Sequence, residues 1–317
     1  MNAVISRNLR SRLSFHIRHQ IRLYSAATDL RRTREELRSL GCGSVDFDTK
    51  FAPGIALISL RNPGRHNALC GRMMAQLADV VDKLQNIVEG KVESEEESAL
   101  VAVILTGSGN KSFCYLNVAK DHINDSTGAA KMGSVMQDTL LRFFRLPLIS
   151  VAAIEGYALG GGAELTTSCD YRIMSHSAVV RFVATSPVWG GGARLVGIVG
   201  RSKALKLLAT GDKITGQSAL DMGFANALSE SGESVSKSIE FLDPFVYFLE
   251  PTEREHGSER KRSSVKAVRS MKSLIASAST DPLDVVKQVE FDLFCGLWGS
   301  GENKEILEEY KRRRVKE

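Results

Sequence analysis

The sequence predicts an α/β fold, because short apolar runs alternate along the chain with longer segments of helical periodicity. Three runs have the length and composition of buried strands, at residues 54–60, 101–107 and 148–154. Between the first two runs, apolar residues recur every three or four positions from Met73 to Ile87, which is the spacing of an amphipathic helix. The 317 residues are enough for a substantial buried core.

The other elements of this core follow in chain order. Pro147 ends a helical segment, and a glycine cluster precedes another. We expect a loose lead-in over 29–50, a solvated acidic loop over 89–98, a helix over 131–145, a helix that opens near Ala163, and short strands at 171–174 and 179–183.

The character of the chain changes near residue 200, where helical patterns replace strands. We interpret residues 45–228 as the core and residues 263–317 as a helical C-terminal subdomain. A polar, irregular connector over 229–262 is expected to join them. Helices are expected at 201–211, 216–222, 263–279, 282–295 and 302–313.

Composition excludes several classes of protein. Apolar residues make up 43% of the chain and charged residues 25%, which is the balance of an ordinary globular protein. No uninterrupted apolar stretch reaches the length of a membrane-spanning helix, so we expect no membrane partner. The five cysteines are scattered without metal-ligand spacing, so no metal site is indicated.

The net charge of +5 comes from the N-terminus. Residues 1–28 hold five arginines and no acidic residue, while the rest of the chain is neutral. A neutral body lacks the basic surface that nucleic acid requires, so no nucleic-acid partner is expected. The amphipathic, acid-free segment has the composition of a mitochondrial presequence and predicts the matrix, although a disordered basic tail is the alternative.

Residues 149–175 (ISVAAIEGYALGGGAELTTSCDYRIMS) carry the clearest chemical signal. A strand leads to Gly160, Gly161 and Gly162, and the next helix has Glu164 in its first turn. Glycines before a helix let a ligand approach free backbone N–H groups, which can stabilise a developing oxyanion. The alternative is a tight turn in which glycine serves only packing.

This segment resembles the signature of the crotonase (enoyl-CoA hydratase/isomerase) superfamily. Further matching motifs lie at 62–69 (NPGRHNAL), 105–114 (LTGSGNKSFC) and 189–228, in the order typical of the family. Within the superfamily, the PVWGG turn and residues 291–303 (FDLFCGLWGSGEN) are most similar to the ethylmalonyl-CoA decarboxylase branch.

The resemblance implies a spiral core of repeated ββα turns and a C-terminal helical subdomain for trimerisation. It implies an acyl-CoA substrate and assembly as a homotrimer or a dimer of trimers. No cofactor is expected, because CoA is part of the substrate. The decarboxylase branch implies the cytosol, which is an alternative to the matrix.

The resemblance also implies roles for individual residues. The Gly161 N–H would form half of an oxyanion hole, Cys114 or Tyr115 would supply the other half, and Glu164 or water would donate a proton. The residues expected to bind CoA or line its site are His66, Asn67, Ala68, Gly160, Gly162, Pro187, Trp189 and Gly190. Taken by itself, His66 reads as a surface turn residue.

Two departures from the family pattern bear on the reaction. The loop after Cys114 is shorter than in relatives and lacks their glycine, and the loop after Val183 is shorter too. No Asp or Glu occurs from Ser175 to Gly192, where hydratases carry a second carboxylate. We therefore predict decarboxylation of a short branched malonyl-CoA, converting ethylmalonyl-CoA to butyryl-CoA, with methylmalonyl-CoA as a second substrate. The alternatives are an enoyl-CoA hydratase of fatty-acid β-oxidation and a catalytically impaired CoA-binding homologue.

Overall fold

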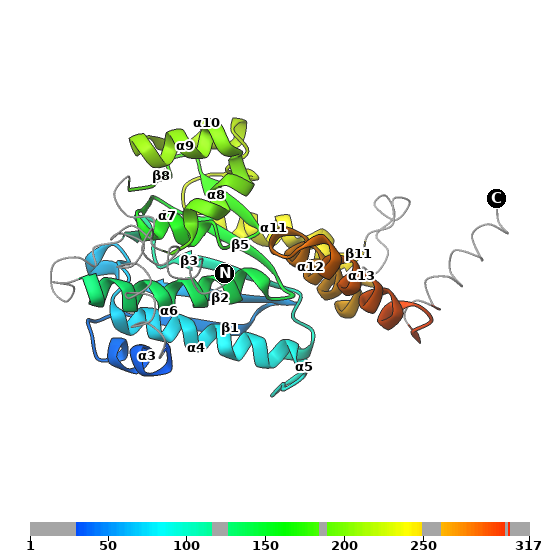
Figure 1. The fold of residues 1–317 in the computed structure, drawn as a ribbon. Helices are drawn as coiled ribbons and strands as arrows, with labels where there is room; N and C mark the ends of the chain where they lie inside the picture. The colour runs from blue at the N-terminus through cyan, green and yellow to red at the C-terminus, as the bar shows by residue number, and fades with distance from the viewer. Residues whose placement is uncertain (1–29, 116–125, 184–188, 249–260, 302–303, 305–317) are drawn as a thin grey trace, which may run out of the picture.

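The computed structural model describes residues 30–115, 126–183, 189–248, 261–301 and residue 304 (Figure 1). The predicted presequence, Pro187 and nearly all of the helix expected at 302–313 lie outside these residues. The strands are β1 (Ser44–Ala52), β2 (Ile55–Arg61), β3 (Ala102–Gly107), β4 (Ser112–Tyr115), β5 (Ile149–Ile154), β6 (Tyr157–Leu159), β7 (Tyr171–Ser175), β8 (Val179–Arg181), β9 (Lys213–Thr215), β10 (Ala227–Ser229), β11 (Tyr247–Phe248) and β12 (Lys261–Arg262). The helices are α3 (Leu30–Arg38), α4 (Gly71–Val88), α5 (Glu95–Ser98), α6 (Ser126–Arg145), α7 (Gly161–Thr166), α8 (Gly191–Val199), α9 (Arg201–Thr210), α10 (Gly216–Asp221), α11 (Ser234–Val246), α12 (Val265–Thr280) and α13 (Leu283–Leu297), with a 3₁₀ turn η1 at Pro63–Arg65.

The main sheet has six strands in the order β1-β2-β3-β5-β7-β10. β1 and β2 are antiparallel, and the pairs from β2 to β10 are parallel. Every residue of β3 and β5 is buried, because helices cover both faces of the sheet. This double burial explains why these strands are continuous apolar runs in the sequence.

A second sheet, in the order β4-β6-β8-β9, produces a repeating pattern. Strands β3, β5 and β7 of the main sheet are each followed, after a short turn, by β4, β6 and β8 of the second sheet. The three second-sheet strands are parallel to one another. A helix then follows each of β4, β6 and β8, so the chain advances in ββα turns.

The two faces of the main sheet have separate hydrophobic cores. On one face, Ile58 and Leu60 pack with the buried stripe of α4 and with α6. On the other face, Ile55 and Ile104 pack with Leu242 of α11. Alternate residues of β2 therefore enter different cores, as the two-residue period of a strand requires.

Two segments that the sequence predicted to be irregular are ordered. Residues 29–50 form α3 and β1, and α3 is fastened to α4 by ion pairs of Arg34 and Arg38 with Asp79. Part of the connector expected over 229–262 forms α11, which packs against β3, β5 and β7. The buried residues of α11 recur every four positions, but two of the four are Ser234 and Ser238, so the sequence shows no continuous apolar stripe there.

The C-terminal helices confirm the helical segments expected at 263–279 and 282–295. α12 and α13 pack against each other at one end of the molecule, away from the second sheet (Figure 1). α12 also contacts α6. Among the described residues, no helix has the length and apolarity needed to cross a bilayer.

Candidate functional site

The glycine turn lies where the second sheet meets helix α7. β4 pairs with β6, so that Cys114 lies beside Ala158 and Tyr115 beside Leu159. The next residue, Gly160, has φ 60° and ψ −119°, which is a conformation open to glycine and not to other residues. Gly160 also donates its N–H to the carbonyl of Arg181 at the end of β8. The fold therefore brings Cys114, Tyr115 and the three glycines together.

Gly162 allows α7 to lie directly against β4. A Cβ at this position would overlap the backbone carbonyl of Cys114. All six residues of α7 are buried, and its first internal hydrogen bond runs from the Glu164 N–H to the Gly160 carbonyl. The N–H groups at the start of α7, N-terminal to Glu164, have no acceptor within the helix. The Gly161 N–H is one of them, and such an N–H can donate a hydrogen bond to an anionic oxygen.

The two candidates for the second oxyanion donor differ in their surroundings. The Tyr115 N–H donates to the carbonyl of His66 at 3.1 Å. This hydrogen bond occupies the donor, so the structure does not favour Tyr115 in that role. Cys114 is fully buried, and burial raises the pKa of its thiol to about 12. Its side chain is therefore a neutral packing group. Residues 116–125, which follow, are outside the described part of the chain.

The His66–Asn67–Ala68 segment lies against this region, but Asn67 has an internal role. The Asn67 amide donates to the carbonyls of Ser108 and Ser112, at 2.9 and 2.7 Å, and accepts the Asn62 N–H at 3.0 Å. Its φ of 54° is a conformation that asparagine tolerates better than most residues. Asn67 and Ala68 are buried, whereas His66 is exposed. Of the three, His66 is the residue whose side chain a ligand could reach from solvent.

Glu164 is buried and connects α7 to α8. Its Oε2 accepts hydrogen bonds from the backbone N–H groups of Trp189 and Gly191, each at 2.9 Å. These residues form the turn before α8, in which Gly190 has φ 79°. The structure thus places Glu164 next to Trp189 and Gly190. Proton donation by Glu164 stays a prediction.

Arg194, near the start of α8, also forms hydrogen bonds around the turn that contains Trp189 and Gly190. It donates to the Thr167 hydroxyl at 3.1 Å and to the Trp189 carbonyl at 3.0 Å. Burial lowers the pKa of Arg194, and the neighbouring Glu164 partly opposes that shift. The sequence reasoning missed Arg194, because nothing local to the chain shows that its partners lie across a helix–helix contact.

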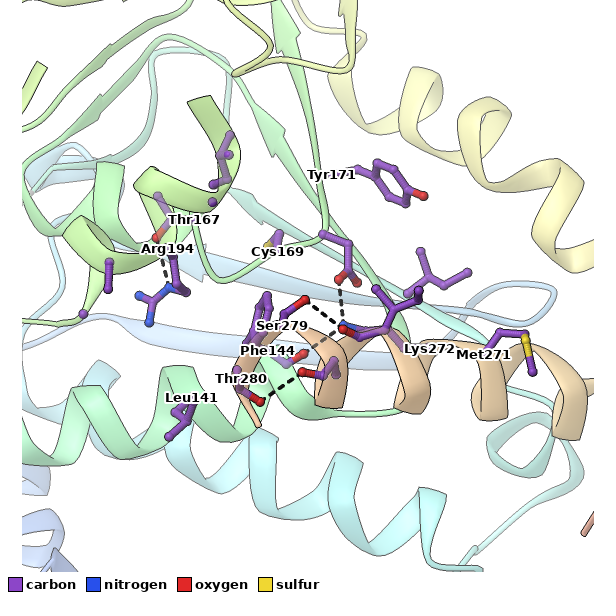
Figure 2. A pocket seen from close by; sticks show the side chains of 18 of the residues that line it. Leu141, Phe144, Thr167, Cys169, Tyr171, Arg194, Met271, Lys272, Ser279 and Thr280 are labelled. Carbon is purple, nitrogen blue, oxygen red and sulfur yellow. Dashed lines mark hydrogen bonds and ion pairs between the residues drawn. The ribbon is translucent and has the colours of Figure 1, made fainter. Parts of the chain in front are cut away.

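A large apolar cavity of about 1070 Å³ lies beside this turn, between α6, α8 and α12 (Figure 2). Trp189 and Gly190 form part of its wall. Leu141, Phe144 and Met271 contribute apolar surface, and the polar groups in the wall include Arg194, Thr167, Asp170 and Lys272. Trp189 is 1% exposed, and its backbone N–H is one of the two that the Glu164 carboxylate accepts.

The described residues contain no group of three or more His, Cys, Asp or Glu side chains that could hold a metal ion.

Residues 50–246 match the enoyl-CoA hydratase/isomerase family. The chain is 36% identical over 286 residues to the ethylmalonyl-CoA decarboxylase of Danio rerio, covering 86% of each chain. It is 35% identical over 283 residues to the ethylmalonyl-CoA decarboxylase of Homo sapiens, covering 86% of this chain and 83% of that one.

Solved structures share the fold. An enoyl-CoA hydratase from Bacillus anthracis is 27% identical with a TM-score of 0.66, covering 86% of this chain and 96% of that one. DspI from Pseudomonas aeruginosa is 22% identical with a TM-score of 0.68, covering 85% and 94%, and shows likeness of fold alone. These likenesses confirm the α/β architecture that the sequence predicted.

Proposed function

Because the chain belongs to the enoyl-CoA hydratase/isomerase family, the crotonase superfamily that its motifs indicated, we propose that it decarboxylates a short branched malonyl-CoA. The substrate that we propose is ethylmalonyl-CoA, the product is butyryl-CoA, and methylmalonyl-CoA is a second substrate to test. The relatives named as ethylmalonyl-CoA decarboxylases, at 34–36% identity, support this substrate class.

The proposed reaction breaks the bond between C2 and the free carboxylate of the substrate. Carbon dioxide leaves, and the electron pair moves into the thioester carbonyl to give an enolate. Backbone N–H groups stabilise the negative oxygen, and C2 then takes one proton from water or from a side chain. The reaction as proposed uses no metal and no cofactor, because the thioester itself accepts the electrons.

The observation that carries the proposal is the glycine turn at the start of α7. Gly161 and Gly162 are buried, and Gly162 lets the helix approach β4, so the N–H of Gly161 is in a region where water is scarce. A donor in such a region can contribute ~3–4 kcal/mol to an oxyanion transition state. Decarboxylation fits this chain better than hydration, since residues 175–192 contain no second carboxylate.

To test the proposal, the purified protein is incubated with ethylmalonyl-CoA. Carbon dioxide release and butyryl-CoA formation are then measured by mass spectrometry. We expect one butyryl-CoA for each carbon dioxide. Hydration of crotonyl-CoA without decarboxylation would favour the hydratase alternative. Binding of ethylmalonyl-CoA without any turnover would favour an impaired CoA-binding homologue, and either result would contradict the proposal.

We also propose assembly as a homotrimer or a dimer of trimers through the C-terminal helices. Phe291 and Phe294 of α13 and Trp298, directly after it, are 53–62% exposed, and Ile275 of α12 is 62% exposed. Large apolar side chains on one protruding pair of helices are suited to a subunit interface. Light scattering of the parent and of a Phe291→Glu/Phe294→Glu variant tests this, and we expect a smaller assembly for the variant.

For localisation, we propose the mitochondrial matrix on the basis of residues 1–28, with the cytosol as the alternative. Imaging a reporter fused to residues 1–30 tests the proposal. Replacing the five arginines of this segment by glutamine is the control, because import of presequences depends on their basic face.

A further inference from the structure

We infer that Glu164 and Arg194 are positioning residues that together hold the turn Trp189–Gly191 against helix α7. In this role Glu164 serves as a hydrogen-bond acceptor and not as a proton donor. The kinetic part of the inference rests on the proposed decarboxylase function, whereas the structural part can be tested without any turnover.

Glu164 provides the first attachment. One oxygen of its carboxylate receives two backbone N–H groups, from Trp189 and Gly191, that lie 25 and 27 residues further along the chain. The N–H of Gly191 is at the start of α8, where the helix itself offers no acceptor. A carboxylate at a helix N-terminus is also stabilised by the helix dipole. The same oxygen thus caps α8 and fixes its distance from α7.

Arg194 provides the second attachment. Its guanidinium bridges the Thr167 hydroxyl, at the end of α7, and the Trp189 carbonyl, at the start of the turn. The N–H and the carbonyl of Trp189 are therefore both engaged, one by Glu164 and the other by Arg194. This arrangement leaves the Trp189 backbone little freedom to move relative to α7.

The glycines of the turn show how closely these parts fit. A Cβ on Gly191 would come within 2.5 Å of the Glu164 Cγ, and a Cβ on Gly190 would lie 3.1 Å from an Arg194 nitrogen. Gly190 also has a positive φ. A side chain at Gly191 would overlap Glu164, and one at Gly190 would need a strained backbone and a small shift of Arg194.

The attachment matters because its two ends lie in different parts of the site. Helix α7 carries Gly161, the proposed oxyanion donor, and the turn carries Trp189, which forms cavity wall. Loss of the attachment would let Trp189 shift relative to Gly161. Misplacement of a site by about 1 Å can cost on the order of a hundredfold in rate.

Fluorescence tests the attachment directly. The chain has two tryptophans, Trp189, which is 1% exposed, and Trp298, which is 62% exposed. In a Trp298→Phe background, emission reports Trp189 alone. We expect Glu164→Ala to shift this emission to longer wavelength and to increase quenching by acrylamide. Glu164→Gln should match the parent, because its amide oxygen can still accept both N–H groups.

A matched control is Glu97→Ala. Glu97 is also buried, and its carboxylate also accepts a backbone N–H, from Glu93, but it lies in α5, outside the site. It should leave the Trp189 spectrum unchanged. An unshifted spectrum in folded Glu164→Ala protein would overturn the inference, and so would a Glu164→Gln spectrum that matches that of Glu164→Ala.

If Glu164→Ala does not fold, Arg194→Met carries the test. Its control is Arg269→Met, because Arg269 also makes two hydrogen bonds through its guanidinium, to the backbone carbonyls of Leu100 and Ser98. We expect a shift of Trp189 emission for Arg194→Met and none for Arg269→Met. Equal spectra for these two variants would also overturn the inference.

Kinetics then separate positioning from acid catalysis. If Glu164 positions the turn, Glu164→Gln should keep kcat near that of the parent, and Glu164→Ala should lose about a hundredfold in kcat/KM. If Glu164 were the general acid, both variants would lose about 10²–10⁴-fold in kcat. A parent protein with no decarboxylase activity would contradict the proposed function, while the spectra would still decide the inference.

Discussion

Lys272 of helix α12, which Figure 2 labels, and Asp170, directly before β7, form a largely buried ion pair with a 2.7 Å contact between Nζ and Oδ1. The Lys272 ammonium also donates to the Phe144 carbonyl at 2.8 Å, and the second Asp170 oxygen accepts from the N–H and hydroxyl of Ser150. The Asp170 carboxylate therefore connects α12 to the start of β5, and the Lys272 ammonium connects α12 to α6.

Replacing Lys272 by Met should destabilise the protein by about 3–5 kcal/mol, because it leaves the Asp170 carboxylate without its charged partner. The free energy of unfolding in urea is the measurement. The double variant Lys272→Met/Asp170→Asn should recover part of the loss, since the lone charge is then removed. As a control, the exposed Lys266→Met on the same helix should change stability by less than about 0.5 kcal/mol. A Lys272→Met protein as stable as that control would contradict this account.

We predict that Asn67 stabilises the region around the glycine turn. Asn67→Ala leaves the carbonyl of Ser112 and the N–H of Asn62 without their partner. It also places alanine at φ 54°, which alanine tolerates less well than asparagine. We expect a loss of about 3 kcal/mol in urea unfolding. Asn67→Gly should be less damaging by about 1 kcal/mol, because glycine accepts the positive φ at no cost. Equal stability of the two variants would show that the backbone conformation is unimportant.

Gly161→Pro should decrease kcat on ethylmalonyl-CoA by about two to three orders of magnitude, which corresponds to ~3–4 kcal/mol in the barrier. Proline removes the N–H that would receive the thioester oxygen, and the first position of a helix tolerates it. Substrate binding, measured by calorimetry, should fall less. Gly161→Ala retains the N–H and should be the more active of the two. A folded Gly161→Pro protein that works at the parental rate would remove Gly161 from the mechanism.

The exposed and the buried cysteines should react differently with a thiol reagent. Cys114 and Cys169 are buried, which raises the pKa of each to about 12, so at pH 8 about one in ten thousand of these thiols is ionised. Cys42 and Cys295 are exposed. In an assay with Ellman's reagent, Cys42→Ser/Cys295→Ser should remove the fast phase, and the Cys114 and Cys169 thiols should react on unfolding in urea. Fast labelling of Cys114 in folded protein would show that β4 opens readily.

The elements that the sequence predicted best depend on local patterns. β3 and β5 are continuous apolar runs because both faces of the main sheet are covered, and α4 shows a regular apolar stripe because one side of it is buried. The glycine turn was visible for a similar reason, since Gly160 must adopt a backbone conformation that other residues avoid. Such constraints act on residues that are close in the sequence, so they produce patterns that the sequence shows.

The contacts that organise the site depend on residues far apart in the sequence, and only the tertiary structure decided them. Glu164 could be recognised as a buried acid after three glycines, but its two partners come from a turn 25 and 27 residues away. The place of Asn67 beside CoA stays a prediction, but its amide donates to carbonyls 41 and 45 residues away, which the sequence did not show. The pair Lys272–Asp170 spans 102 residues. Hydrogen-bond partners of this kind are selected by the packing of whole elements, which leaves no periodic pattern in the amino-acid sequence.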